Sequence, residues 1–231
     1  EEIAKIITRD PVYISVGSPG AVNTAISQIV VWVETNQKTK RLFSILKSNK
    51  FMPPAVVFVE SKIGAEMLCK SINKKLRIEA KYIHGDRTMD DRMYVMNSFL
   101  SGEFPLLVAT SLVGRGLDLK NVLQVINFDM PKSVKEYIHR IGRTGRLGVP
   151  GMAITFINGE DSRVSIAFAD MLLSSGVKIP QQLMGLCNKM KQRANNNTHR
   201  SGRTSNSNRE SNEMLQEVMF KKRYNRRGSR K

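Results

Sequence analysis

Residues 106–118 read LLVATSLVGRGLD, an apolar run that breaks abruptly into a polar, glycine-containing stretch. The apolar residues favour a buried strand over 106–109, and Thr110 opens the loop that follows. Ligands of open parallel sheets bind outside the carboxyl ends of the strands, so we expect a site at this loop. Gly114 and Gly116 are two residues apart, but Leu119 stands where a dinucleotide fingerprint has its third glycine. A nicotinamide-type site is therefore disfavoured.

A second informative stretch, HRIGRTGR, occupies residues 139–146. Arg140, Arg143 and Arg146 recur every third residue, so they are expected to share one helical edge. Guanidinium groups fit pairs of phosphate oxygens, and Gly142 and Gly145 would leave the backbone bare for an approaching anion. The alternative is a solvated basic face or a localisation signal. The regular glycines favour phosphate binding, because a solvated helix face does not need them.

Apolar patterning along the rest of the chain predicts alternating strands and helices. The expected strands are 26–33, 55–60, 78–83, 106–109, 122–128 and 152–157. The expected helices are 38–48, 62–75, 89–100, 134–141 and 161–175. Such alternation implies right-handed crossovers and an α/β fold, with a parallel sheet covered by helices on both faces.

The charge distribution divides the chain into one globular domain and its ends. The net charge is +17, and residues 181–231 carry 13 Lys and Arg against 3 Asp and Glu. This excess predicts a polyanionic partner, most simply nucleic acid. We assign 1–24 to the end of a preceding domain and a linker, 25–180 to the domain, and 181–231 to a basic, mostly disordered tail. The first residue, Glu1, leads us to expect a fragment of a longer protein.

The sequence offers little support for membrane or disulfide chemistry. No apolar run approaches the ~20 residues that span a bilayer, and no signal peptide opens the chain. Cys69 and Cys187 lack further ligands at zinc-site spacing, so we expect ordinary buried or free thiols and no metal site. An intracellular location, in nucleus or cytoplasm, is expected.

Several blocks in a fixed order resemble the C-terminal RecA-like domain of the DEAD-box ATP-dependent RNA helicases. VVFVES at 56–61 resembles motif IV, and IHGDR follows at 83–87. Residues 109–118 are similar to motif V, and HRIGRTGR matches motif VI without a change. The resemblance covers most of residues 25–180. It implies a RecA-like fold, RNA and ATP as ligands, and the protein's own N-terminal RecA-like domain as a partner.

The resemblance also implies roles for individual residues. Arg143 and Arg146 would be arginine fingers that reach the γ-phosphate, and His139 and Arg140 would couple domain closure to an acidic motif of the other domain. Asp118 would bind the ribose, with Gly116 beside it. RNA phosphate contacts are implied for Ser61, Gly85, Arg92 and Thr110. Each of these four residues has a simpler interpretation as a helix cap or turn residue, especially Ser61.

The chain departs from the family pattern in two places. Met89 stands where Gln begins the Gln-x-x-R element, and Ser111 replaces the aspartate that commonly follows Ala-Thr in motif V. We expect one polar interaction fewer near RNA and a changed hydrogen-bond network around motif V.

Residues 1–231 contain neither Gly-x-x-x-x-Gly-Lys-Ser/Thr nor Asp-Glu-Ala-Asp. ATP and Mg²⁺ would then be held mainly by a missing N-terminal domain, and this chain alone would be inactive. Two alternatives remain open: a non-catalytic RNA-binding or partner-docking module, and a related helicase that acts on DNA.

Overall fold

The computed structural model describes residues 23–111, 122–146 and 148–201, together with Ile7, Arg9 and Leu119. Of Arg163 and residues 194–201 it describes only the backbone. The strands are β1 (Ile26–Trp32), β2 (Ala55–Val59), β3 (Ala80–Ile83), β4 (Leu106–Thr110), β5 (Gln124–Asn127) and β6 (Gly151–Ile157). The helices are α2 (Lys38–Leu46), α3 (Lys62–Leu76), α4 (Met89–Leu100), α5 (Val134–Ile141), α6 (Ser162–Ser174) and α7 (Gln181–Ser201). Two 3-10 turns, η1 (Thr35–Gln37) and η3 (Gly159–Asp161), precede α2 and α6.

The described strands form one parallel sheet in the order β1-β6-β5-β2-β4-β3. Strands β2, β4 and β5 are buried along their whole length, as expected for strands covered on both faces. Their apolar runs explain why the sequence predicts them: each side chain needs an apolar neighbour, whichever face it points to.

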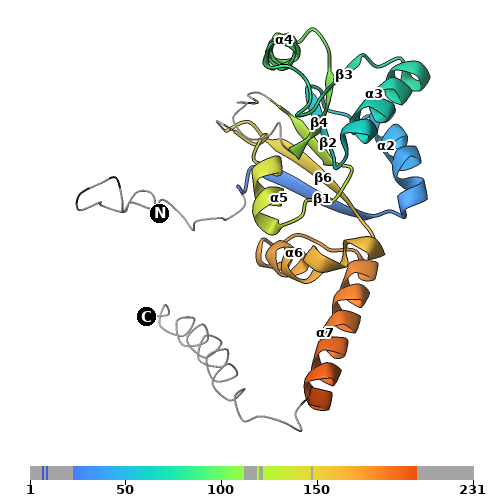
Figure 1. Cartoon of the computed structure of the whole chain (residues 1–231), viewed down its shortest axis with the longest axis vertical. Helices are drawn as coiled ribbons and strands as arrows, with labels where there is room; N and C mark the ends of the chain where they lie inside the picture. Colours follow the sequence, from blue (N-terminus) through green and yellow to red (C-terminus); the bar gives the residue numbers. More distant parts are fainter. Residues whose placement is uncertain are drawn as a thin grey trace. The chain divides into compact units, whose positions relative to one another are not determined.

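Alternate residues of each strand pack into separate hydrophobic cores on the two faces of the sheet. Val57 and Val59 pack with α2 and α3 on one face, whereas Val56 and Phe58 pack with α4 on the other. Val125 of the α4 face is paired with Ala153, which packs with α5 and α6, so these helices cover the α4 face too. Figure 1 shows α2 and α3 together on one side and α5 and α6 beside β1. The predicted RecA-like α/β architecture is confirmed.

The region after residue 180 differs from the expected tail. Helix α7 follows Pro180, and Leu183 and Cys187, one turn apart on its first part, are buried with α6. The sequence did not predict this contact because residues 181–231 as a whole have a low apolar content. Residues 202–231 lie outside the described residues, so the expectation for them stays a prediction. Among the described residues, no helix is both long and apolar enough to cross a membrane.

Candidate functional site

Three neighbouring strands bring three of the expected RNA contacts to one edge of the sheet. Val59, at the end of β2, is paired with Thr110 at the end of β4. Ser61 lies two residues after Val59. Gly85 lies in the turn after β3, the strand on the other side of β4. Because parallel strands end at the same edge, these residues gather at the carboxyl edge of the sheet. Arg92, the fourth, comes from α4, the helix that follows the Gly85 turn.

Ser61 caps the N-terminus of α3. Its Oγ accepts a hydrogen bond from the Gly64 N–H at 2.9 Å, so the simpler interpretation of this residue is realised in the structure. The side chain remains exposed at the sheet edge. A cap in this place does not prevent its hydroxyl group from donating to an anion.

Three buried polar atoms at this edge have no hydrogen-bond partner among the described residues. They are Thr110 Oγ1, Arg92 Nε and His84 Nδ1. Leaving a buried donor or acceptor unpaired costs about 1–3 kcal/mol, so such atoms are rare in native proteins, and an ordered water or a bound ligand would complete their bonding. Two of them belong to residues predicted to contact RNA. The third, His84, was missed by sequence reasoning although it stands inside the IHGDR block.

The loop after β3 is fixed by contacts on several sides. His84 Nε2 lies 3.2 Å from Glu66 Oε1 of α3, and its ring stacks on Tyr82 with centroids 5.6 Å apart. Lys62 Nζ lies 2.5 Å from Asp86 Oδ1, and this hydrogen bond lowers the pKa of the Asp86 carboxyl. The Arg87 guanidinium lies 4.4 Å from the Tyr82 ring centroid, within cation–π range. The backbone at Gly85 is therefore held in place before any ligand arrives.

Met89 contacts the very arginine that the resemblance assigns to RNA. An NH2 group of Arg92 lies 2.9 Å from Met89 Sδ, one helical turn away. A thioether is a weak acceptor, so this contact orients Arg92 without neutralising it. Methionine in place of the usual glutamine thus gives Arg92 a weak hydrogen-bond acceptor instead of a more polar one.

The predicted common helical edge of the three arginines is wrong. Helix α5 begins after Ser133, whose Oγ accepts from the Glu136 N–H, and ends at Ile141 with Gly142 as its C-cap. Arg140 therefore lies in the helix, whereas Arg143 and Arg146 lie beyond it. The two glycines shape the backbone here: Gly142 is the C-cap of α5, and Gly145 turns the chain with a φ of +69°. Their expected role in admitting an anion stays a prediction.

Packing, too, requires glycine at position 145. A Cβ at this position would collide with Cγ1 of Ile26 at the start of β1. The Gly145 carbonyl oxygen also accepts a hydrogen bond of 2.6 Å from Asn23 Nδ2. The turn after α5 is thereby fastened to the segment that leads into β1.

Arg140 points into its own domain and is 5% exposed. Its Nε and an NH2 group donate to Glu136 Oε1, and NH1 donates to the Asp129 carbonyl oxygen at 2.9 Å. Burial lowers the pKa of Arg140, and the carboxylates of Glu136 and Asp129 act against this shift. Four of the five N–H groups of Arg140 donate within the domain, and its expected coupling to an acidic motif of another domain stays a prediction.

Glu136, one turn before Arg140 on α5, links that arginine to Ser111. Burial acts to raise the pKa of Glu136, but the charge and hydrogen bonds of Arg140, the Lys132 N–H and the Ser111 side chain outweigh it and lower the pKa. Ser111 follows β4, at the start of motif V. A carboxylate from α5 thus stands beside Arg140, and the serine hydroxyl group joins the same network.

His139, Arg143 and Arg146 lie nearer the surface than Arg140. His139 is exposed on α5, Arg143 is half-buried, and Arg146 Nε donates to the Gly142 carbonyl oxygen at 2.7 Å. Thr144 Oγ1 donates to the carbonyl oxygen of Leu123, which precedes β5, so this turn lies toward the amino ends of the strands. The predicted RNA contacts and the predicted fingers therefore occupy different ends of the sheet. Asp118 and Gly116 lie outside the described residues.

Comparison with known proteins agrees with the motif order. The model of the "Helicase conserved C-terminal domain" matches residues 37–148. DEAD-box ATP-dependent RNA helicase 41 of Arabidopsis thaliana is 44% identical over 187 residues, which cover 80% of this chain and 37% of the relative. The probable ATP-dependent RNA helicase DDX59 of Homo sapiens is 40% identical over 185 residues, 80% of this chain and 30% of the relative. The chain thus spans about a third of the length of these curated relatives.

Solved structures show the same fold. The RNA helicase Prp28 from Chaetomium thermophilum, bound to ADP, superposes with a TM-score of 0.63 at 37% identity, covering 79% of this chain and 44% of that one. The C-terminal domain of the DEAD-box protein Dbp5 gives a TM-score of 0.58 at 26% identity, covering 73% of this chain and 98% of that one. Motif order, fold and relatives agree, and the chain belongs to the DEAD-box RNA helicase family, whose helicase C-terminal domain it carries.

Proposed function

We propose that this chain is the C-terminal half of an ATP-dependent RNA helicase. In this proposal, Arg143 and Arg146 are arginine fingers for ATP hydrolysis, and the carboxyl edge of the sheet binds the phosphates of RNA. The ATP-binding loop and the acidic magnesium motif belong to an N-terminal RecA-like domain, and the chain alone does not hydrolyse ATP.

The observation that carries the RNA part of the proposal is the set of unpaired buried atoms at Thr110, Arg92 and His84. A phosphate oxygen accepts from a hydroxyl group and a guanidinium N–H, so RNA would supply what this edge lacks. None of these contacts would read a base, and an enzyme that acts on many RNA sequences needs contacts of this kind. The net charge of +17 favours the same polyanion.

The nucleotide part of the proposal rests on the chemistry of the two arginines. Bound ATP would supply the phosphoryl group, and guanidinium groups that meet it at domain closure stabilise the charge of the transition state. Arg143 and Arg146 fit this role because they lie beyond the end of α5, outside the helix that places Arg140 in its buried network. His139, exposed on α5, would face the incoming domain. Asp118 and Gly116 would contact the ribose.

Mg²⁺ would be bound mainly outside this chain. Over the parts of the chain that the structure describes, no group of three or more His, Cys, Asp or Glu side chains could hold a metal ion. Nucleus and cytoplasm both suit an enzyme of this kind. Prp28 of Chaetomium globosum, 40% identical over 185 residues, is named a pre-mRNA-splicing helicase, and a role in RNA processing is a natural extension.

The ATPase test is a chimera in which residues 23–201 replace the corresponding half of the Arabidopsis relative. We expect RNA-stimulated ATP hydrolysis, and a fall of about 10³-fold in Arg143→Ala, since an arginine finger contributes about 10³ to 10⁵ in rate. Arg41→Ala, an exposed arginine on α2, is the matched control and should hydrolyse normally. Unchanged hydrolysis in Arg143→Ala would favour the non-catalytic binding module instead.

The RNA test uses the 231-residue chain and a fluorescent single-stranded RNA. Binding should weaken with salt with a log–log slope of about −0.7 per neutralised phosphate. A DNA strand of the same sequence should bind less tightly if contacts include the 2′-hydroxyl group. Equal or tighter binding of DNA would point to the DNA-directed alternative, and robust ATP hydrolysis by the chain alone would overturn the two-domain proposal.

A further inference from the structure

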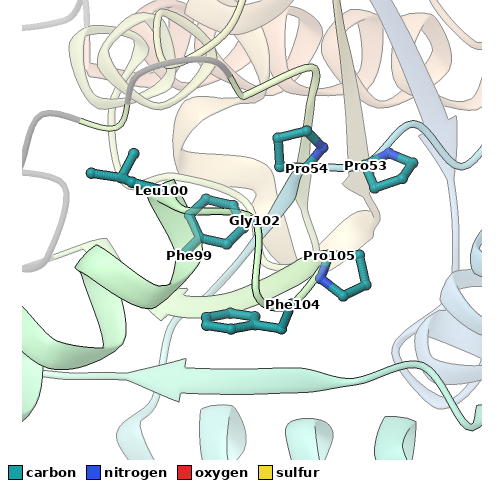
Figure 2. A pocket seen from close by; sticks show the side chains of 7 residues that line it. All are labelled: Pro53, Pro54, Phe99, Leu100, Gly102, Phe104 and Pro105. Atoms are coloured by element: carbon teal, nitrogen blue, oxygen red, sulfur yellow. The ribbon is translucent and has the colours of Figure 1, made fainter.

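A small apolar pocket opens at the amino edge of the sheet, on the face covered by α4. Pro53 and Pro54, which precede β2, form one wall, and Phe99 and Leu100 of α4 with Phe104 and Pro105 form the other. Figure 2 shows the rings of Phe99, Phe104 and the prolines around this space. Pro105 directly precedes β4 and Thr110 ends it, so the pocket lies about 16 Å along the strand from the proposed RNA contacts.

The size and lining of the pocket define what can enter it. Its volume is about 230 Å³, and none of its lining side chains carries a polar atom. Sites for drug-sized ligands measure about 300–1,000 Å³ and contain a few polar groups, so a nucleotide does not suit it. An apolar cavity of about 150 Å³ can already hold a benzene molecule. The pocket therefore has room for one bulky apolar side chain.

The pocket continues into apolar surface. Leu100 is 43% exposed, and Met93, two helical turns before it on the same face of α4, is 42% exposed. At Gly102 a Cβ would meet no atom within 4 Å, so the rim is open there. A pocket with an adjoining exposed stripe can receive an anchor residue together with the chain that carries it.

Positively charged residues lie at the same edge of the sheet as the pocket. Lys50 is exposed three residues before Pro53, and Lys81 Nζ lies 4.9 Å from the centroid of the Phe104 ring, which lines the pocket. The last turn of α3, on the opposite face of the sheet, ends at this edge with Lys74 and Lys75, and Arg77 follows.

Acidic groups near the pocket are fewer. The described residues of the α3–β3 and α4–β4 connections contribute Glu79 and Glu103. Hydrogen bonds from Ser98 and Ser101 lower the pKa of Glu103, so its carboxylate stays charged, and the charge of Lys81 acts in the same direction. Positive charge exceeds negative charge at this edge, which favours an acidic partner.

We propose that this pocket docks an acidic peptide segment of a protein partner through one bulky apolar side chain. The anchor fills the space between Pro54 and Phe104, and acidic residues on either side of it meet Lys50 and Lys81. The pocket lies at the other end of β4 from the proposed RNA contacts, whereas the turn that carries Arg143 and Arg146 lies toward the same amino ends of the strands as the pocket.

The probe is a short fluorescein-labelled peptide with one central phenylalanine flanked by glutamates and aspartates, titrated into the full chain and followed by polarisation. Two further probes are a peptide with alanine in place of the phenylalanine and one with lysine in place of the acids. We expect binding of the first probe, and at least about tenfold weaker binding of the other two. Equal binding of the alanine peptide, or no binding of the first, would overturn the proposal.

Protein variants test the location. Leu100→Glu and Leu100→Ala should each weaken binding of the phenylalanine peptide, the former by at least about tenfold. Leu173→Glu, at a 55% exposed leucine on α6, is the matched control and should bind normally. Circular dichroism of both glutamate variants reports whether they fold. An unchanged affinity in folded Leu100→Glu contradicts the proposal.

Two measurements distinguish other occupants. Leu100→Glu should bind single-stranded RNA like the parent chain, and an equal loss of RNA and peptide binding would identify the pocket as part of an RNA surface. In sedimentation experiments, we expect the parent chain and Leu100→Glu to have the same oligomeric state. Self-association that Leu100→Glu abolishes would identify a second copy of the chain as the occupant and overturn the proposal.

Discussion

Arg140 and Glu136 lie one turn apart on α5, and two nitrogens of the arginine, Nε and NH2, donate to the same carboxylate oxygen at 3.1 and 2.7 Å. Their side chains are 5% and 19% exposed. Most surface ion pairs contribute little, but a buried charge whose partner is removed is costly. The pair is also joined to the first residue of the motif V loop, because Ser111 contributes a hydrogen bond to Glu136. The first arginine of HRIGRTGR is thus held by groups of its own domain.

Glu136→Ala should lower the free energy of unfolding by about 3 kcal/mol, because it leaves the Arg140 guanidinium buried without its main partner. The measurement is urea denaturation followed by circular dichroism. Glu60→Ala is the matched control, since Glu60 pairs with Lys132 at 3.0 Å on the surface and its removal should cost less than about 1 kcal/mol. An equal loss of unfolding free energy in the two variants would show that removing a partner of the buried pair is no more destabilising than removing one of a surface pair.

Gly145→Ala and Gly148→Ala should separate backbone strain from packing. Both glycines have a positive φ, +69° and +79°, but only a Cβ at position 145 meets Ile26, whereas one at 148 meets no atom within 4 Å. We expect Gly148→Ala to cost about 1 kcal/mol and Gly145→Ala about 2 kcal/mol more in urea denaturation. Adding Ile26→Ala should narrow the gap between the two variants. A gap that Ile26→Ala leaves intact would contradict the packing explanation.

The sequence predicted the sheet well because buried parallel strands need apolar residues on both faces. Strand β2 was expected at 55–60 and spans Ala55–Val59, and α4 matches its expected range of 89–100. Apolar patterning predicted a helix over 134–141, which is the span of α5. The shared edge of the three arginines rested on three-residue spacing alone, and that spacing does not require a helix that continues past Ile141. Periodicity failed at α7, whose buried Leu183 and Cys187 stand within a polar segment.

Thr110→Val should stabilise the folded chain and weaken RNA binding. The Thr110 hydroxyl group is buried without a partner among the described residues, so replacing it by a methyl group of the same shape should raise the free energy of unfolding by about 1 kcal/mol. If the hydroxyl group donates to an RNA phosphate, affinity for single-stranded RNA should fall about tenfold.

Thr155→Val is the matched control for that substitution. Thr155 Oγ1 accepts a hydrogen bond of 3.0 Å from Asn127 Nδ2 inside the sheet. Its removal should cost about 1–2 kcal/mol and leave RNA affinity unchanged. A destabilised Thr110→Val that binds RNA like the parent would remove Thr110 from the proposed site.

The site was less predictable than the fold because it depends on side-chain environment. The family resemblance pointed to Thr110 and Arg92, and each of these side chains has a buried atom without a partner among the described residues. Spacing could not show that Arg140 turns inward, since that depends on Glu136 and on the Asp129 carbonyl oxygen. The sequence did not predict His84 as a site residue, because a histidine after a strand forms no distinctive sequence pattern. The roles of Arg143, Arg146 and Asp118 stay predictions.

Cys69 should be nearly inert toward alkylation in the folded chain. Burial raises the pKa of its thiol to about 11 from an ordinary value of 9.0, and its Sγ lies 3.1 Å from the Ala80 carbonyl oxygen. Iodoacetamide reacts with the thiolate, so at pH 8 labelling should be at least about 100-fold slower than in urea, as read by mass spectrometry of Cys187→Ser protein. Because the folded pKa is raised, the associated stability is present below pH 9 and falls as the pH rises toward 11. Equal labelling rates with and without urea would contradict this.

Deleting residues 202–231 tests whether the basic tail binds RNA. The deletion removes 9 Lys and Arg and 3 Asp and Glu but keeps α7. If the tail neutralises phosphates, the log–log salt slope of RNA binding should become shallower by about 0.7 for each phosphate that the tail no longer neutralises, because fewer counterions are released. Thermal denaturation of the truncated chain serves as the control for folding. An unchanged slope would mean that RNA is bound by the globular domain alone, and the carboxyl edge around Thr110 would then have to account for the whole electrostatic contribution.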